Sequence, residues 1–295
     1  MIDRFCLFID KNRGFSKNTI GNYRRTLNLF KAYLDRYWKD IDQIDHITLK
    51  DINDFIFVQR LYKSAVTCNN YLSAIRTYLY FWMSLGLEVV NPKLLLNQRT
   101  QTRKIESLND DETKTLLEYF RTAPCWESKW EELIKVRNYL MLLLLVYTWI
   151  RVSELVNIRV EDIGETLIVR GKGWKIRPIK LFSDELAQAK LYLFMRRKFK
   201  SEYLFISFAN NSRGEWLSRN AVEKIISGGA IKAGIKTKVF PHKLRHTFAT
   251  NLLRRNANLY HIKELLGHAS ITTTQTYLTV RNYELANTQK LLPRF

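Results

Sequence analysis

Cysteine is scarce in this sequence, and long apolar runs are missing. The 295 residues include three widely separated cysteines, Cys6, Cys68 and Cys125, with no CxxC pair. This pattern predicts neither a disulfide framework nor a zinc knuckle, and it fits a reducing compartment. The longest apolar stretch, YLMLLLLVYTWI at 139–150, has 12 residues. It is too short to span a bilayer and predicts a buried core helix. The N-terminus carries charges within its apolar stretch, unlike a signal peptide.

Acidic residues are also in short supply. The chain has 48 Lys and Arg against 28 Asp and Glu, a formal net charge of +20. Residues 1–97 carry a net charge of +5 and residues 98–295 a net charge of +15. This balance predicts a polyanionic partner, and nucleic acid is the usual one, although ribosomal and membrane-surface proteins share the property.

The length allows two domains. Residues 1–91 predict a helical bundle, in which Ser16 is placed to cap a helix with apolar residues at helical spacing. Residues 92–107 are polar and basic and predict a linker. Residues 108–295 predict a second domain, which opens with a helix that has an acidic first turn and is helical again from about Ser183 to its end.

One segment of the second domain alternates apolar and polar residues. The stretch ETLIVRGKGWKIRPIKL (165–181) turns at a Gly-Lys-Gly triplet centred on Lys172 and predicts a β-hairpin. The fold class is therefore mainly α with a small β-hairpin. From Arg170 to Lys180 the hairpin has five Lys and Arg and no acid. Taken alone, this is simply a solvated charged turn. Its glycines would also let it approach a polyanion closely.

The segment between residues 232 and 263 contains no Asp or Glu. Within it, PHKLRHTFATNLL (241–253) predicts an amphipathic helix whose apolar stripe includes Phe248. Arg245 lies three residues before Phe248, at or beside that stripe, and His242 lies three residues before Arg245. A guanidinium held against a core without a partner is costly, so this position predicts a bound anion.

A metal is a poor candidate for the ligand of this region. The HKLRH pair has the two-histidine spacing of a zinc-protease helix, but the glutamate after the first histidine is missing. Lys243 and Arg245 stand between the histidines and would repel a cation. We therefore expect no metal site.

A phosphodiester fits the basic residues better. His242 and Arg245 share a helix face, and arginine grips phosphate oxygens with two nitrogens. Arg151 follows the most apolar helix, although alone it is more simply a helix-end cation paired with Glu154. Together, two guanidinium groups can stabilise a pentacoordinate phosphorane, a deprotonated tyrosine can attack it, and a lysine or histidine can protonate the leaving oxygen. The full set is Arg151, Lys172, His242, Arg245, His268 and Tyr277.

Four ordered segments that carry these residues resemble those of the tyrosine recombinases, of the integrase and Xer kind. They are TWIRVSELVNIRVEDI, GKGWKIRPIKL, HKLRHTFATNLL and LLGHASITTTQTYLTV, the last with nine residues from His268 to Tyr277. The N-terminal SKNTIGNYRRTLNLFKAYL is similar to the helical core-binding (SAM-like) domain of that family. The resemblance spans nearly the whole chain and implies two domains that clamp DNA.

The resemblance implies a role for each residue of the set. Tyr277 would attack the scissile phosphate and form a 3′-phosphotyrosyl bond. Arg151 and Arg245 would hold the non-bridging oxygens, where His268 would donate a hydrogen bond. Lys172 would protonate the departing 5′-hydroxyl.

Two residues would support this chemistry, and others would bind DNA. His242 would exchange protons with the tyrosine, and Glu154 would orient the first arginine. The family uses no metal, nucleotide or other cofactor, because the bond energy is kept in the phosphotyrosine. The DNA-binding candidates are Arg24, Arg25, Lys31, Arg76, Lys175 and Arg177.

The implied partners are a double-stranded DNA recombination site and a homotetramer, or a paired recombinase, on two such sites. The tail after Tyr277 resembles a segment that docks onto a neighbouring protomer. We expect no membrane and no small-molecule substrate, and a cytoplasmic location at the nucleoid. The biological role would be Xer-like resolution of chromosome or plasmid dimers, or integration and excision of a mobile element.

Three other functions compete with this interpretation. They are a DNA-binding regulator on a recombinase scaffold, a topoisomerase of the type IB style, and a phosphate-handling hydrolase. The sequence also departs from the family pattern. Trp149 stands where a small residue is common, and Ile150 replaces a leucine, which predicts altered packing behind Arg151. The stretch 121–133 looks longer than in compact Xer proteins.

Overall fold

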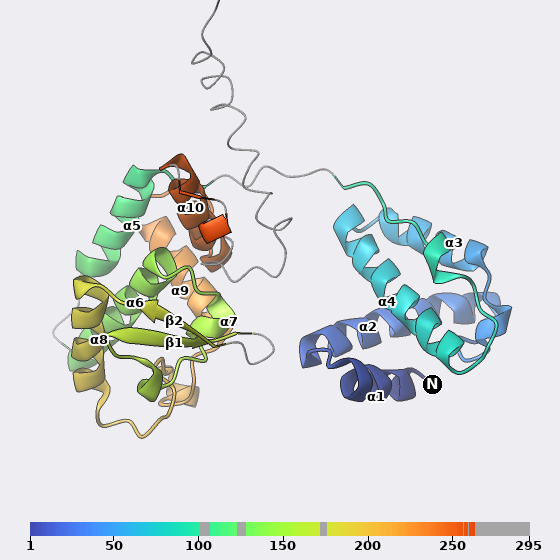
Figure 1. Cartoon of the computed structure of the whole chain (residues 1–295), viewed down its shortest axis with the longest axis horizontal. Coiled ribbons are helices and arrows are strands. Elements are labelled where there is room, and N and C mark those ends of the chain that lie inside the picture. The colour runs from blue at the N-terminus through green and yellow to red at the C-terminus, as the bar shows by residue number, and fades with distance from the viewer. Residues whose placement is uncertain (101–106, 123–127, 172–175, 256, 259, 263–295) are drawn as a thin grey trace, which may run out of the picture. The chain divides into compact units, whose positions relative to one another are not determined.

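The computed structural model describes residues 1–100, 107–122, 128–171, 176–255, 257–258 and 260–262. The chain forms two compact units, Met1–Arg103 and Lys104–Phe295 (Figure 1). Within the described ranges the structure is helical apart from one two-stranded sheet and two isolated β-bridges, which confirms the predicted fold class.

The first unit is a helical bundle around an aromatic core. Three of its helices, those that begin after Ser16, Thr48 and Ser64, start at side-chain caps. The Ser16 hydroxyl accepts from the backbone N of Thr19 at 3.2 Å, as predicted, and Thr48 and Asp51 cap each other. Phe5 and Tyr78 are fully buried and meet edge to face with ring centroids 5.2 Å apart. The helices are α1 (Ile2–Arg13), α2 (Lys17–Leu34), α3 (Leu49–Arg60) and α4 (Ala65–Ser84), with short 3₁₀ turns at Asp35–Tyr37, Ile44–His46 and Pro92–Leu94.

The start of the predicted linker belongs to this first unit. Leu95 is 3% exposed and lies in the aromatic core, and its carbonyl accepts a hydrogen bond from Nη2 of Arg76 at 2.7 Å. The Asn69 amide pairs with the backbone of Gln98 through two hydrogen bonds of 3.0 and 2.7 Å. Residues 92–98 are therefore packed on α4 and are not linker, a correction to the predicted range 92–107. Residues 101–106 lie outside the described residues.

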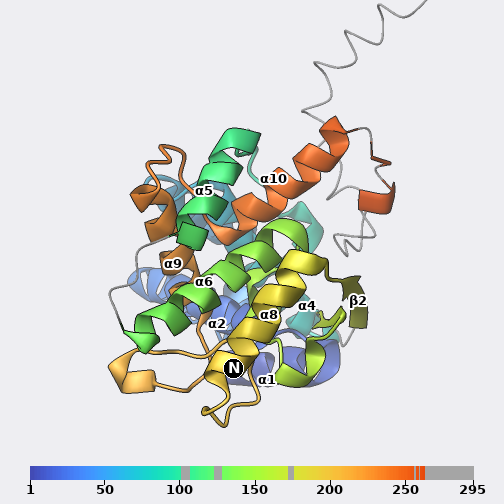
Figure 2. The same cartoon turned by 90° about the vertical axis from the view of Figure 1, so that its left-hand side faces the viewer.

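The second unit is built around α6 (Lys129–Tyr147), the helix that contains most of the apolar stretch. Its residues 140–145 are all buried, as predicted for a core helix. The longer helices that pack against α6 are α5 (Asp110–Thr122), α8 (Ser183–Arg196) and α10 (Pro241–Arg254) (Figure 2). Helix α9 (Arg219–Lys232) contacts α5, α10 and the short α7 (Val152–Leu155), and a 3₁₀ turn spans Val160–Asp162.

The predicted hairpin is present as β1 (Thr166–Arg170) and β2 (Ile176–Lys180). The strands are antiparallel, with Thr166 opposite Lys180 and Arg170 opposite Ile176. Leu167, Val169 and Ile179 face the core of the second unit. The turn residues 172–175 lie outside the described residues.

Helices do not continue from Ser183 to the end as predicted. An irregular segment with one 3₁₀ turn (Asn210–Ser212) separates α8 from α9. It folds back on itself, with the backbone N of Leu217 donating to the carbonyl of Phe205 at 3.1 Å. Phe205 and Ile206 are fully buried, and consecutive buried apolar residues suit this extended pairing better than the surface of a helix.

The long stretch 121–133 contributes an aromatic contact to that segment. Trp130, near the start of α6, meets the ring of Phe199 at 5.8 Å and that of Phe208 at 6.2 Å. The guanidinium of Arg213 lies 5.0 Å from the Trp130 ring centroid. Trp130 thus ties the irregular segment to the start of α6. Residues 123–127 lie outside the described residues.

The contact between α5 and α9 depends on a glycine. A Cβ built on Gly229 would stand closer than 3.0 Å to the ring of Phe120, which is 5% exposed, whereas a Cβ on Gly228 meets nothing within 4 Å. We expect Gly229→Ala to destabilise the protein, because overpacking costs about 1–3 kcal/mol and exceeds the gain of about 1 kcal/mol from helix propensity.

Gly228→Ala is the matched control and should be neutral or slightly stabilising. Urea unfolding of both variants measures the difference. Equal stability of the two proteins would show that α9 can move away from Phe120 at no cost.

Candidate active site

The turn that follows α6 has an unusual backbone. Thr148 caps the end of the helix, with its backbone N donating to the Leu144 carbonyl at 3.0 Å. Trp149 then takes a φ of 46°, in the left-handed region that favours glycine. Its ring packs on Phe248 of α10 with centroids 4.9 Å apart, and Ile150 is buried. Behind Arg151, the packing is therefore made by the Trp149 ring. Its tertiary contacts hold Trp149 in a backbone conformation that costs on the order of 1 kcal/mol or more.

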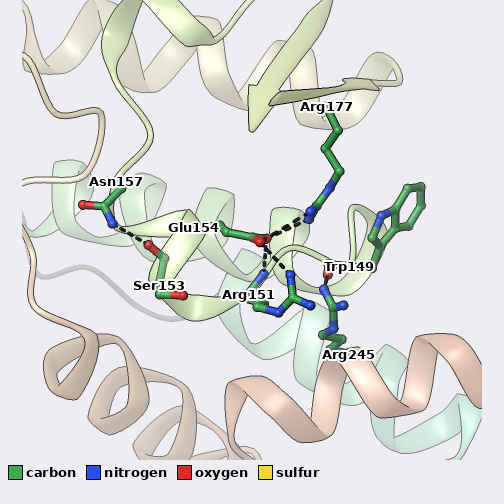
Figure 3. A network of polar contacts seen from close by, with 7 residues as sticks. All are labelled: Trp149, Arg151, Ser153, Glu154, Asn157, Arg177 and Arg245. Atoms are coloured by element: carbon green, nitrogen blue, oxygen red, sulfur yellow. Dashed lines mark hydrogen bonds and ion pairs between the residues drawn. The ribbon is translucent and has the colours of Figure 1, made fainter. Parts of the chain in front are cut away.

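Glu154 lies at the centre of the polar network. Nη1 of Arg151 donates to its Oε1 at 2.8 Å, and the backbone N of Arg151 donates to Oε2 at 2.9 Å. From β2, Nη2 of Arg177 donates to Oε2 at 2.7 Å. Figure 3 shows the two arginines meeting this carboxylate from different elements. The Glu154 side chain is 5% exposed, whereas that of Arg151 is 34% exposed. The ion pair expected between Arg151 and Glu154 exists, and it leaves part of Arg151 open to solvent.

The charge state of Glu154 follows from these contacts. Burial alone would raise the pKa of its carboxyl. The hydrogen bond from the Arg151 backbone, the positive charge of Arg177 and the side-chain hydrogen bonds from both arginines outweigh burial, and the pKa of Glu154 is lowered. Glu154 is thus a carboxylate at neutral pH, and it attracts both guanidinium groups.

The predicted helix 241–253 is present as α10, with Pro241 in its first turn. Arg245 is 4% exposed, and its Nη1 donates to the carbonyl of Trp149. Figure 3 shows the Arg245 guanidinium next to that of Arg151. The segment of sequence around Arg245 contains no acidic residue.

His242 lies at the start of the same helix, and its side chain is exposed. Loss of hydration against the surrounding protein, followed by the positive charges of Arg245 and Arg151, lowers the pKa of His242. The imidazole is therefore neutral at neutral pH and can accept a proton. The structure thus brings together Arg151, Glu154, His242 and Arg245, and adds Arg177. Lys172, Lys175, His268 and Tyr277 lie outside the described residues.

Several predicted DNA-binding residues have partners within the protein. Arg177 is held by Glu154 inside the site, and Arg76 is held by the Leu95 carbonyl. Both residues are partly buried, and DNA binding by either stays a prediction. Arg24 pairs with Asp3 at 2.5 Å, and Lys31 with Asp35 at 3.4 Å. These two pairs are solvent-exposed and therefore weak enough to exchange for a phosphate.

Arg25 is exposed and lies in a polar groove between α2 and α4. The groove has a volume of about 680 Å³, and no acidic side chain is among its lining residues. Sequence analysis missed the neutral polar residues of this groove. The signal was present in α2, where Thr19, Asn22 and Thr26 recur at helical spacing on one face. The lining residues are Thr19, Asn22, Tyr23, Arg25, Thr26, Leu29, Thr67, Asn70, Tyr71 and Ser73.

Neither a metal cluster nor a membrane helix is found in the described part of the chain. No three His, Cys, Asp or Glu side chains gather there in an arrangement that could hold an ion. Among the same residues, no helix combines the length and apolar character that crossing a membrane requires.

Comparison with known proteins identifies the family of this chain. The phage integrase family matches residues 106–284, and its N-terminal SAM-like domain matches residues 2–86. The chain therefore belongs to the phage integrase family, and it is a tyrosine site-specific recombinase.

The curated relatives are of the Xer type. The tyrosine recombinase XerD of Staphylococcus aureus is 33% identical over 298 residues, which cover 97% of this chain and 95% of the relative. That of Listeria innocua serovar 6a is 31% identical over 304 residues, covering 98% of this chain and 97% of the relative.

Two solved structures have the same fold. The crystal structure of XerA recombinase aligns over 100% of this chain and 98% of its own, with a TM-score of 0.54 and 28% identity. The XerH recombinase bound to its palindromic difH substrate, a post-cleavage complex, aligns over 98% of this chain and 84% of its own. Its TM-score is 0.74 and its identity 22%.

The ionisation of Glu154 predicts a pH-dependent contribution to stability. Because its folded-state pKa lies below the ordinary value of 4.5, this contribution is complete above that pH and is lost as the pH falls through the folded-state value. We expect Glu154→Gln to be less stable than the wild type at neutral pH, by about 1–3 kcal/mol. The difference should shrink steadily below pH 4.5.

Urea unfolding at a series of pH values measures this difference. Glu161→Gln removes a carboxylate that is 67% exposed and controls for the general loss of negative charge. A gap between wild type and Glu154→Gln that stays constant at acid pH would contradict the assignment of Glu154 as the stabilising anion.

Proposed function

We propose that this recombinase cuts and rejoins DNA strands through a 3′-phosphotyrosyl intermediate on Tyr277. The observation that carries the proposal is the proximity of Arg151 and Arg245. Arg245 donates to the carbonyl of Trp149, two residues before Arg151, and the charges of both arginines act on His242 (Figure 3). A phosphodiester has one negative charge in the ground state and two in the phosphorane. Two adjacent guanidinium groups favour the second state over the first.

Some of the residues in the proposed reaction are described by the structure, and the others belong to sequence motifs outside the described residues. The Tyr277 oxygen forms a bond to the scissile phosphorus as the bond to the 5′-oxygen breaks. His242, kept neutral by its surroundings, takes the phenolic proton. Lys172, which follows β1 in the sequence, delivers a proton to the departing 5′-oxygen, and His268 hydrogen-bonds a non-bridging oxygen. Attack by the 5′-hydroxyl of a second strand reverses the step and frees the tyrosine.

The first unit offers a surface that fits recognition of a duplex. The groove between α2 and α4 combines Arg25 with the exposed amides of Asn22 and Asn70. Arginine and asparagine are the side chains that pair with guanine and adenine edges in the major groove. We propose that these three residues contact base pairs of the recombination site, while Arg24 and Lys31 exchange their weak ion pairs for phosphates.

We further propose that four protomers assemble on two DNA sites in the cytoplasm, at the nucleoid. The lambda integrase, which is 20% identical to this chain with a TM-score of 0.68, has been solved as a tetramer bound to a Holliday junction. Strand exchange between two duplexes requires four cleavages, and head-to-tail contacts around a ring supply four equivalent sites. The tail after Tyr277 would form these contacts.

Tyr277→Phe tests the proposed nucleophile. Phenylalanine keeps the ring and removes the attacking oxygen, so we expect no covalent DNA adduct and nearly unchanged DNA affinity. A nicked suicide substrate traps the adduct, and a denaturing gel detects it as a shifted band. Tyr260→Phe, a change to an exposed tyrosine at the start of the helical turn after α10, is the control and should form the adduct normally.

An adduct formed by the Tyr277→Phe protein would assign the attack to another residue. Supercoil relaxation by single protomers on any sequence, without exchange between paired sites, would favour a type IB topoisomerase instead.

A further inference from the structure

Arg177 lies on the hairpin, yet it points into the site and not toward solvent. It is the second residue of β2, opposite Val169. Its two terminal nitrogens reach the two oxygens of Glu154, Nη2 to Oε2 at 2.7 Å and Nη1 to Oε1 at 3.4 Å. The Arg177 side chain is 21% exposed, and its Nε is buried. The guanidinium is thus committed to one carboxylate.

From this geometry we infer that Arg177 is a positioning residue for Arg151, which acts through Glu154 and does not bind DNA. The inference rests on the proposed function, in which Arg151 holds the scissile phosphate. It gives the hairpin a second task in the reaction, beside the one that the sequence assigns to Lys172 in its turn.

The charge balance supports this role. A buried carboxylate paired with Arg151 alone would neutralise the arginine that must attract a phosphate. With Arg177 present, two guanidinium groups share one carboxylate and the group of three keeps a net charge of +1. Arg177 therefore preserves positive charge at Arg151, while Glu154 fixes the position of the Arg151 guanidinium.

The hydrogen bonds support it as well. Each Glu154 oxygen accepts from both arginines: Oε1 from the Nη1 atoms of both, and Oε2 from the Arg151 backbone and Nη2 of Arg177. A carboxylate has about four acceptor positions, so these contacts occupy it fully. Without Arg177, two positions open, and Arg151 can turn its fork onto both oxygens. That movement would withdraw Arg151 from the phosphate.

The same contact sets the position of the hairpin. Strand β2 is bonded to α7 through Arg177 and Glu154, and Lys172 lies between β1 and β2 in the sequence. Because β2 is held against Glu154, the same contact would fix the position of Lys172, the proposed general acid, relative to Arg151. This predicts that loss of Arg177 slows cleavage more than the loss of a single surface charge.

Single-turnover cleavage of a suicide substrate at saturating DNA, together with the salt dependence of binding, tests the inference. We expect Arg177→Gln to cleave about 10- to 100-fold more slowly, the range seen when a partner that orients a functional ligand is removed. The slope of log K against log[salt] should stay unchanged, because no phosphate contact is lost. Arg177→Lys keeps the charge but not the fork and should recover part of the rate.

Lys180→Gln is the matched control. It removes an exposed cation from the same strand and should cleave at the wild-type rate. If Arg177 instead binds DNA, the slope of log K against log[salt] will be smaller by about one for Arg177→Gln, and this variant will cleave normally at saturating DNA. That result would overturn the inference.

A double-mutant cycle with Glu154→Gln gives an independent answer and does not depend on the size of the single effect. If Arg177 acts through Glu154, its removal should slow the Glu154→Gln protein by less than about twofold. Multiplication of the two single defects would show that Arg177 acts independently of Glu154 and would also refute the inference. A failure of the proposed function is separate, since it appears as a covalent adduct in the Tyr277→Phe protein.

Discussion

The site depends on a buried carboxylate that stays ionised between two arginines. Glu154, in the short helix α7, joins the residue that precedes this helix to the second strand of the hairpin, 23 residues further along the chain. A buried carboxylate is costly without partners, and here every acceptor position is filled. These contacts therefore fix the Arg151 guanidinium, which the long, flexible side chain would not hold in place by itself.

The second arginine is held in a different way. Arg245 lies in a segment without acidic residues, and its described hydrogen bond goes to a backbone carbonyl, that of Trp149. A carbonyl orients a guanidinium but does not neutralise it. The left-handed backbone of Trp149 and the contact of its ring with Phe248 bring that carbonyl to α10. Arg245 thus lies close to the turn that carries Arg151, and two guanidinium groups so placed would both stabilise a bound phosphate.

Sequence patterns predicted the local structure well, because local structure depends on neighbours. The cap at Ser16, the core helix from the apolar run and the two strands of the hairpin all follow from periodicity and turn residues. The absence of acids around Arg245 predicts an anion site there, and this stays a prediction. The contact of Arg177 with Glu154 was not predicted, because Glu154 lies 23 residues earlier and meets Arg177 only through the register of β2. The packing of Leu95 and the pairing after α8 likewise depend on tertiary contacts, which no local pattern contains.

The central claim is that Arg151 and Arg245 act by compensating negative charge on the scissile phosphate. A methylphosphonate at that position replaces a charged non-bridging oxygen with a neutral methyl group, and it tests the claim most directly. Cleavage by Arg151→Ala and Arg245→Ala would be measured on phosphate and methylphosphonate substrates. The account predicts a defect of about 10²-fold or more on the phosphate and a much smaller one on the neutral substrate. Equal defects on both substrates would contradict it and would leave the two arginines a purely structural role.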